Sequence, residues 1–231
     1  MRFIWILFLS LSIYSQDKSK QVLFVGNSLT YTNDLPKIVE QIASNFNETI
    51  TTTSLCYPNY ALIDHWNDGK LQKYIKTGKF DYVIIQQGPS SQNDGRQMLL
   101  SDGAKIKALC EEHGSQLVYF MVWPSKNYYY TFDGVIANHK FAAKQNKALL
   151  CPVGVIWKTY DANKALENLY SVDGFHPSKA GSFLAALTIF NTIYPNKNIS
   201  DLSFKSSKTW MTNKKSFDTI IELINNQNQK K

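Results

Sequence analysis

Two short segments at opposite ends of the chain carry the side chains that acyl transfer by serine requires. An apolar run ends at Gly26 and is followed by Ser28, and Asp173 lies three residues before His176. A serine hydroxyl attacks a carbonyl carbon when an imidazole accepts its proton and a carboxylate orients that imidazole. Each segment alone has a simpler interpretation, because a serine after a strand-ending glycine is commonly a turn residue or a helix cap. Together they predict a triad of Ser28, His176 and Asp173.

The order of apolar segments predicts the α/β fold that must position these side chains. Strands that alternate with helices imply βαβ crossovers and a parallel sheet covered on both faces. We therefore expect a three-layer sandwich with a five-stranded, mostly parallel sheet. Short apolar runs indicate strands at 21–26, 50–55, 82–86, 116–123 and 153–156. Apolar residues recur at helical spacing over 34–46, 63–76, 96–113, 134–150 and 178–193.

The same two end segments resemble those of the SGNH hydrolases, also called GDSL esterases and lipases. Residues 26–29, Gly-Asn-Ser-Leu, match the nucleophile block of that family, with Asn27 where an aspartate is usual. Asp173 and His176 match its terminal Asp-x-x-His block. The resemblance covers roughly residues 21–194. It implies a flavodoxin-like sheet and hydrolysis of an ester.

Two middle blocks of the family are altered in this chain. Residues 88–91, Gly-Pro-Ser-Ser, stand where the family has Gly-x-Asn-Asp, which puts Ser90 at the position of an oxyanion-binding asparagine. Residues 58–62 correspond to the other glycine block, with Asn59 where glycine is usual. One donor to the oxyanion is worth about 100- to 1000-fold in turnover. We expect the Ser28 N–H to begin the oxyanion hole, Asn59 to add a backbone donor, and Ser90 or Gln86 to add a side-chain donor. Because a serine hydroxyl reaches less far than an asparagine amide, Gln87 or a water is the alternative for that last role.

The N-terminus predicts export. Arg2 precedes an apolar run at residues 3–9, and residues 10–15 alternate serines with larger apolar and aromatic residues, ending at Ser15. A positive start, an apolar core and a small residue at its end are typical of a cleaved signal peptide. The run is shorter than the about 20 residues of a spanning helix, although an uncleaved membrane anchor is the competing interpretation. We expect a signal peptide at 1–15, a secreted or periplasmic location, and no stable membrane insertion after cleavage.

The rest of the chain, residues 16–231, is expected to form a single SGNH hydrolase domain with a polar C-terminal tail at about 225–231. No linker, repeat or low-complexity block divides it. The formal net charge is +7, but arginine occurs only at Arg2 and Arg96. No cluster of basic residues alternates with aromatic residues, so a nucleic-acid partner is not expected.

The cysteines and histidines do not follow metal-ligand spacings. Cys56, Cys110 and Cys151 are too few and too far apart for a disulfide framework or a Cys-x-x-Cys site. No His-x-His or His-Glu-x-x-His pair occurs. We therefore expect no metal and no cofactor. His65 could line a cleft, although a structural histidine at a helix start is the commoner case.

Aromatic residues follow the fourth predicted strand, at residues 128–130, Tyr-Tyr-Tyr. Aromatic loops at the active edge of a sheet could stack on sugar rings. Aromatic residues make up 13% of the chain, however, and residues so frequent usually pack in the core or at its rim.

These patterns predict a secreted serine esterase acting on a small-molecule or glycan ester, with an O-acetyl group on a carbohydrate as the favoured substrate. The alternative is a noncatalytic carbohydrate- or ester-binding module on the same scaffold, which the altered middle blocks favour. An α/β-hydrolase is a lesser option, because Thr30 stands where the second glycine of Gly-x-Ser-x-Gly belongs. The oligomeric state is left open.

Overall fold

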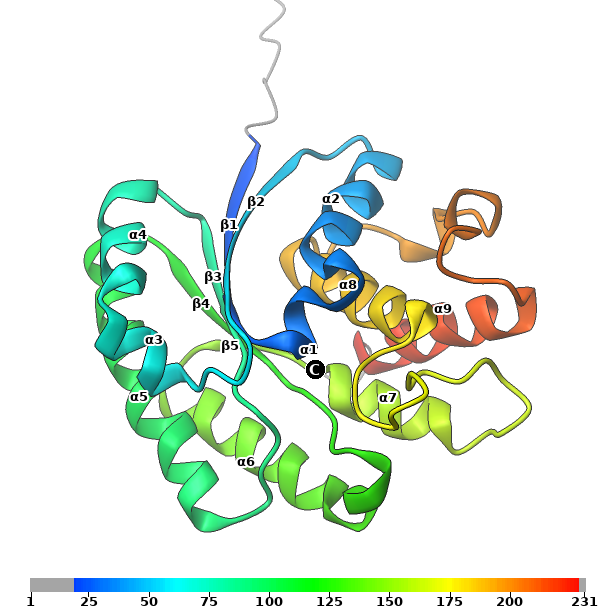
Figure 1. The fold of residues 1–231 in the computed structure, drawn as a ribbon. Helices are drawn as coiled ribbons and strands as arrows, with labels where there is room; N and C mark the ends of the chain where they lie inside the picture. The colour runs from blue at the N-terminus through cyan, green and yellow to red at the C-terminus, as the bar shows by residue number, and fades with distance from the viewer. Residues whose placement is uncertain (1–18, 229–231) are drawn as a thin grey trace, which may run out of the picture.

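The computed structural model describes residues 19–228 and is built around a five-stranded sheet (Figure 1). All neighbouring strands are parallel and their order is β2-β1-β3-β4-β5, so the expected α/β sandwich is confirmed. The predicted signal peptide lies outside the described residues. The strands are β1 (Lys20–Gly26), β2 (Ile50–Cys56), β3 (Tyr82–Ile85), β4 (Gln116–Phe120) and β5 (Leu149–Cys151).

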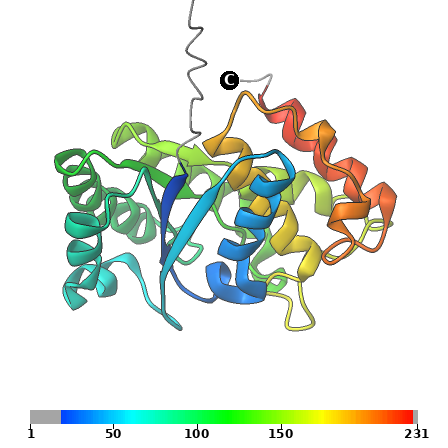
Figure 2. The same cartoon turned by 90° about the horizontal axis from the view of Figure 1, so that it is seen from above.

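Helices cover both faces of the sheet, as the view from above shows (Figure 2). A single turn of helix, α1 (Ser28–Tyr31), follows β1 directly. One face carries α3 (Leu62–Asp68), α4 (Lys70–Gly78), α5 (Asn93–Glu112) and α6 (Phe132–Gln145). The other carries α2 (Leu35–Asn45), α7 (Val153–Asp161), α8 (Lys179–Ile193) and α9 (Lys214–Asn228). The 3-10 helices are η1 (Thr32–Asp34), η2 (Lys126–Thr131), η3 (Ile199–Asp201) and η4 (Lys205–Ser207). None of the helices within residues 19–228 is long and apolar enough to cross a membrane.

Alternate side chains of the central strand β1 enter two separate cores. Val22 and Phe24 pack with α2 and α8, whereas Leu23 and Val25 pack with α3, α4 and α5. All four are fully buried. A strand covered on both faces needs apolar residues at every position, which explains the uninterrupted apolar run before Gly26.

The predicted fifth strand is wrong. Residues 153–156 form the first turn of α7, and the fifth strand is Leu149–Cys151, at the end of a segment predicted as a helix. Pro152 is the N-cap of α7. Val153 and Ile156 are buried against the sheet, so this helix start has the apolar run expected of a strand. A three-residue edge strand is too short to show a period of its own.

Two further segments differ from the sequence-based boundaries. The single helix predicted over 63–76 is divided into α3 and α4 at Gly69, whose positive φ of 77° ends the first helix. The polar tail predicted from about residue 225 continues α9 through Asn228. Asn225 donates a hydrogen bond to Ser200 Oγ at 3.0 Å, which anchors the start of that segment to η3.

Candidate active site

Ser28 is the first residue of α1, immediately beyond the carboxyl end of β1. Asn27 caps this helix: its backbone is extended and its Oδ1 accepts a hydrogen bond from Leu29 N at 3.1 Å. The N–H groups of the first helical residues have no acceptor within the helix. The turn therefore offers both the hydroxyl and the backbone N–H of Ser28 at the active edge of the sheet.

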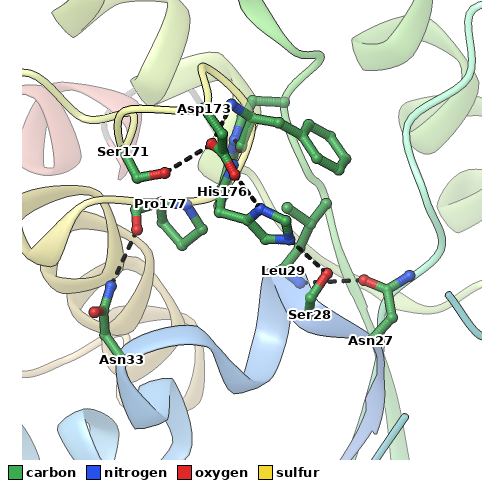
Figure 3. A network of polar contacts seen from close by, with 10 residues as sticks. Asn27, Ser28, Leu29, Asn33, Ser171, Asp173, His176 and Pro177 are labelled. Atoms are coloured by element: carbon green, nitrogen blue, oxygen red, sulfur yellow. Dashed lines mark hydrogen bonds and ion pairs between the residues drawn. The ribbon is translucent and has the colours of Figure 1, made fainter. Parts of the chain in front are cut away.

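Ser28, His176 and Asp173 form a continuous chain of hydrogen bonds (Figure 3). Ser28 Oγ lies 2.8 Å from His176 Nε2, and His176 Nδ1 lies 2.5 Å from Asp173 Oδ2. The contact is made between residues 148 positions apart in the sequence. The prediction that these three side chains meet is confirmed.

The Asp173 carboxylate accepts several hydrogen bonds besides that of the imidazole. Its Oδ1 accepts from Ser171 Oγ at 2.7 Å, Phe175 N at 2.9 Å and His176 N at 3.0 Å. The His176 side chain, the Phe175 backbone and the Ser171 hydroxyl together hold the pKa of Asp173 far below its ordinary value. Asp173 therefore stays ionised and accepts the Nδ1–H of the imidazole, which turns Nε2 toward the Ser28 hydroxyl.

The loop that carries Asp173 and His176 folds back on itself before α8. Ser171 N donates to His176 O at 2.8 Å, and Gly174 adopts a left-handed φ of 70° that a side chain would strain. Trp123 Nε1 donates to Phe175 O at 3.0 Å, which ties the loop to the segment after β4. Ser178 caps α8 by accepting from Gly181 N, as its position predicted.

Gln86 lies beneath the nucleophile turn rather than in an oxyanion hole. It is 1% exposed, and its Oε1 accepts from Asn27 N at 2.9 Å and Thr30 Oγ1 at 3.0 Å. Its Nε2 is buried as well, so it does not reach a substrate. A Cβ at Gly26 would lie 2.6 Å from Gln86 Oε1, so glycine is needed for this close approach. The expectation that Gln86 donates to the oxyanion is wrong, because Gln86 instead supports the nucleophile turn from below.

His65 supports the same turn from α3 and does not line a cleft. It is fully buried, and its Nε2 donates to Gly26 O at 2.8 Å. Burial lowers the pKa of His65, so the ring stays neutral. The rings of Tyr57 and Tyr60 lie 5.9 Å and 5.0 Å from its own. His65 is therefore the structural histidine that its place at a helix start suggested.

Asn59 lies in an exposed turn next to the nucleophile. Its φ of 61° is left-handed, a conformation that asparagine tolerates better than most residues with a side chain, and it stands where the resembling family has glycine. Asn27 Nδ2 donates to Tyr60 O at 3.0 Å, and Leu62 N donates to Gln87 Oε1 at 2.8 Å. These bonds fix the loop of Asn59 to the ends of β1 and β3.

Ser90 lies on the loop after β3, and this loop is fixed from behind by α6. The fully buried Asn138 donates through Nδ2 to Ser90 O at 2.8 Å and Gln92 O at 3.0 Å, while its Oδ1 accepts from Arg96 Nε at 2.8 Å. Ser90 Oγ accepts from Gln92 N at 3.2 Å, so the hydroxyl proton can still be donated. Ser90 is thus half-buried, and it lines the same cleft as Asp173.

A cleft of about 630 Å³ opens beside the triad. Its walls are three loops: Pro89–Gln92 after β3, the segment between Pro124 and Thr131 after β4, and the triad loop at Asp173 and Phe175. Of the triad, Asp173 lines this cleft, whereas Ser28 and His176 do not. A substrate held there meets Ser90 on one side and the loop of the imidazole on the other.

The cysteines are not candidates for a nucleophile. Burial raises the pKa of Cys56 to about 11 and that of Cys110 to about 12, so both stay thiols at neutral pH. No disulfide joins Cys56, Cys110 or Cys151, all of which are described. Within residues 19–228, no group of three His, Cys, Asp or Glu side chains is placed to hold a metal ion.

Solved structures of the same architecture match this chain over most of its length. A DUF4886 family protein from Bacteroides uniformis covers 90% of the chain and 94% of its own, with a TM-score of 0.75 and 15% identity. A protein assigned to the SGNH hydrolases, from Slackia heliotrinireducens, covers 76% of the chain and 100% of its own, with a TM-score of 0.63 and 24% identity. This chain has the SGNH hydrolase fold.

Other structures with this fold are described as lipases, acylhydrolases or esterases. One, an acetyl xylan esterase, covers 75% of this chain and 99% of its own, with a TM-score of 0.59 and 10% identity. No protein-family model matches the sequence, and no curated protein matches it either. The fold expected from the resemblance is confirmed by structure rather than by sequence similarity.

Sequence reasoning missed the supporting role of three residues: Asn27, Gln86 and Asn138. The capping role of Asn27 had a visible signal, because asparagine before a short helix is a favoured N-cap. Gln86 and Asn138 have no local signal, since each acts on a segment 46 or more positions away.

Proposed function

We propose that this protein is a serine esterase that hydrolyses carboxylic esters through Ser28, His176 and Asp173. The observation that carries the proposal is the chain of hydrogen bonds from Ser28 Oγ through His176 to Asp173. The carboxylate stays ionised and faces Nδ1, so the imidazole presents its basic nitrogen to the hydroxyl. The same fold in esterases and acylhydrolases supports the reaction class.

Acylation begins when Ser28 Oγ attacks the ester carbonyl carbon and His176 Nε2 accepts the hydroxyl proton. The carbonyl oxygen becomes an oxyanion, and we assign its stabilisation to the Ser28 N–H, the backbone of Asn59 and the Ser90 hydroxyl. Collapse of this intermediate breaks the bond to the alcohol. His176 gives its proton to the departing oxygen, and the acyl group remains on Ser28.

Deacylation repeats these steps with water. His176 takes a proton from the water as the water attacks the acyl carbon. The second tetrahedral intermediate then releases the carboxylic acid, and His176 returns its proton to Ser28 Oγ. Throughout, Asp173 stabilises the imidazolium that forms when His176 holds the extra proton.

The favoured substrate is an O-acetyl group on a carbohydrate. The acetyl xylan esterase with the same fold shows that this scaffold can carry such an activity. The cleft beside the triad is wide enough for a sugar residue and combines hydroxyl and amide side chains with aromatic rings.

We also propose that the mature chain begins near Gln16 and is exported. N-terminal mass spectrometry of the protein from its native host tests this.

The test of the reaction class is hydrolysis of p-nitrophenyl acetate by the mature chain. Ser28→Ala should abolish it, while the matched control Ser101→Ala, an exposed serine of α5, should not change it. Acetate release from a panel of acetylated oligosaccharides then tests the substrate class. A folded wild-type protein that releases no product from any ester in the panel would overturn the proposal.

The second candidate is a noncatalytic binding module for the same ligands. It is favoured by the altered oxyanion positions, since a serine hydroxyl at Ser90 replaces a longer asparagine amide and Gln86 is withdrawn beneath the turn. In that case the wild-type protein would bind acetylated oligosaccharides without releasing acetate, and Ser28→Ala would bind them equally well.

A further inference from the structure

Two tyrosines are exposed at one wall of the cleft. Tyr130 is 81% exposed and Tyr128 is 60% exposed, although both rings line the same cavity. Their ring centroids lie 6.3 Å apart and the planes are inclined at 59°. Large aromatic side chains left in water beside a cleft are typical of a ligand-binding surface, because they add contact area at little cost in conformational entropy.

The tyrosines are held at a fixed position relative to the triad loop. Lys126 N, at the start of η2, donates to Gly174 O at 2.8 Å. Thr131 Oγ1 donates to Tyr128 O at 2.7 Å at the end of the same 3-10 helix. Tyr129, which lies between the two exposed tyrosines in the sequence, packs edge-to-face on Phe132 of α6 with 5.1 Å between the ring centroids. The segment that carries the two tyrosines is therefore anchored to the triad loop at its start and to α6 near its end.

The position of the cleft indicates which part of an ester it receives. His176 must give its proton to the departing alcohol, so the alcohol lies on the side of the imidazole loop. Asp173 and Phe175 of that loop form one wall of the cleft, and the tyrosines form another. Within the proposed mechanism, a group bound between these walls is assigned to the alcohol part of the ester.

We propose that Tyr128 and Tyr130 form an aromatic platform for a sugar ring of the alcohol part of the ester. This inference rests on the proposed esterase function and narrows its substrate to a carbohydrate. A pyranose ring offers an apolar face of C–H groups to an aromatic ring and hydroxyl groups at its edge. The cleft supplies partners for both, since Gln92 and Asn127 bring amides and Ser91 brings a hydroxyl to the space beside the rings.

Binding to a protein that cannot turn over separates this inference from the esterase proposal. In a Ser28→Ala background, calorimetric titration with acetylated xylo-, manno- and chito-oligosaccharides should find at least one that binds. Tyr130→Ala should then raise the Kd about ten-fold and Tyr128→Ala somewhat less, whereas Tyr130→Phe, which keeps the ring, should bind like the parent. Tyr74→Ala is the matched control, because Tyr74 is a 39% exposed tyrosine of α4 away from the cleft.

Equal Kd values for the parent and both alanine variants would overturn the platform, as would the absence of binding by every oligosaccharide. If the alanine variants bound p-nitrophenyl laurate more weakly but bound the oligosaccharides unchanged, the rings would be assigned to an acyl chain. That result would also overturn the sugar platform. A folded wild-type protein that hydrolyses neither p-nitrophenyl acetate nor any acetylated oligosaccharide would refute the esterase and leave the binding result intact. In an active wild-type background, Tyr130→Ala should lower the ratio of kcat/KM for the oligosaccharide to that for p-nitrophenyl acetate about ten-fold.

Discussion

The turn around Ser28 lies on buried polar side chains from other elements, whereas the loop from Ser171 to Pro177 is held mainly by hydrogen bonds within itself. Gln86 and His65 reach the nucleophile turn from 59 and 39 positions away. Asp173, by contrast, is bonded to residues two and three positions away, and its side chain is 46% exposed. The same site therefore joins a preorganised half inside the protein to a locally folded half at its surface.

The two halves should therefore respond differently to substitution. The surface loop can lose a side chain without unfolding the protein, so substitutions there should lower turnover far more than they lower stability. The buried half couples catalysis to stability, because an unpaired polar group there costs about 1–3 kcal/mol. The predictions below test that division, assuming the proposed esterase activity.

His176→Ala should cause the largest loss. Without the imidazole neither the attack nor the release of the alcohol has a proton carrier, and turnover should fall on the order of a million-fold. The melting temperature should change little, because His176 is one third exposed. Steady-state hydrolysis of p-nitrophenyl acetate together with a thermal melt measures both. Substantial hydrolysis by this variant would rule out the imidazole as the base.

Asp173→Asn should be the next most severe change. An amide can present N–H to Nδ1 and favour the wrong imidazole tautomer, and such a change costs about 10⁴-fold in turnover in a well-studied triad. The kcat of Asp173→Asn should therefore be well above the kcat of His176→Ala, and steady-state kinetics of both variants measures this difference. An Asp173→Asn variant with wild-type kcat would remove the carboxylate from the mechanism.

The same carboxylate should also make stability depend on pH. Because the folded state depresses the pKa of Asp173, its contribution is present above the ordinary aspartate value of about 4 and is lost as the pH falls through the lower folded value. The difference in free energy of unfolding between wild type and Asp173→Asn should therefore shrink below about pH 4. Urea denaturation at several pH values measures it, and a difference that grew on acidification would contradict the assigned hydrogen bonds.

Gln86→Leu should affect the buried half through both activity and stability. Asn27 N and Thr30 Oγ1 would lose their acceptor, and the free energy of unfolding should fall by about 1–3 kcal/mol. A shift of the nucleophile turn by about 1 Å can cost about 100-fold in turnover. Urea unfolding and kcat measured on the folded fraction test this. Full activity combined with full stability would show that the turn does not depend on Gln86.

Ser171→Ala should have the smallest effect of the series. Asp173 Oδ1 would lose the hydrogen bond that it accepts from the Ser171 hydroxyl, but it would keep those from the backbone N–H groups of Phe175 and His176. We expect a loss of roughly three- to ten-fold in kcat, since one hydrogen bond contributes about 1 kcal/mol net. Ser101→Ala serves as the control. A loss as large as that of Asp173→Asn would mean that the hydroxyl, rather than the backbone, fixes the carboxylate.

The division between the halves also explains what could be predicted from the sequence. The Asp-x-x-His spacing and the glycine before Ser28 are local patterns, so the triad contacts could be predicted. The contacts of Gln86 and Asn138 depend on which strand ends adjoin in the sheet, and no spacing reveals them. The fifth strand was misplaced for a similar reason, because a buried helix start at Val153 and a buried strand have the same apolar composition.

The central claim is that His176 activates Ser28 as a nucleophile, and covalent labelling tests it most directly. A fluorophosphonate reacts much faster with an activated serine than with an ordinary hydroxyl, and mass spectrometry of the digested protein locates the adduct. We predict one adduct per chain, on Ser28, in the wild-type protein and none in His176→Ala. An adduct on another residue, or an unlabelled Ser28 in a protein that still hydrolyses p-nitrophenyl acetate, would contradict the account.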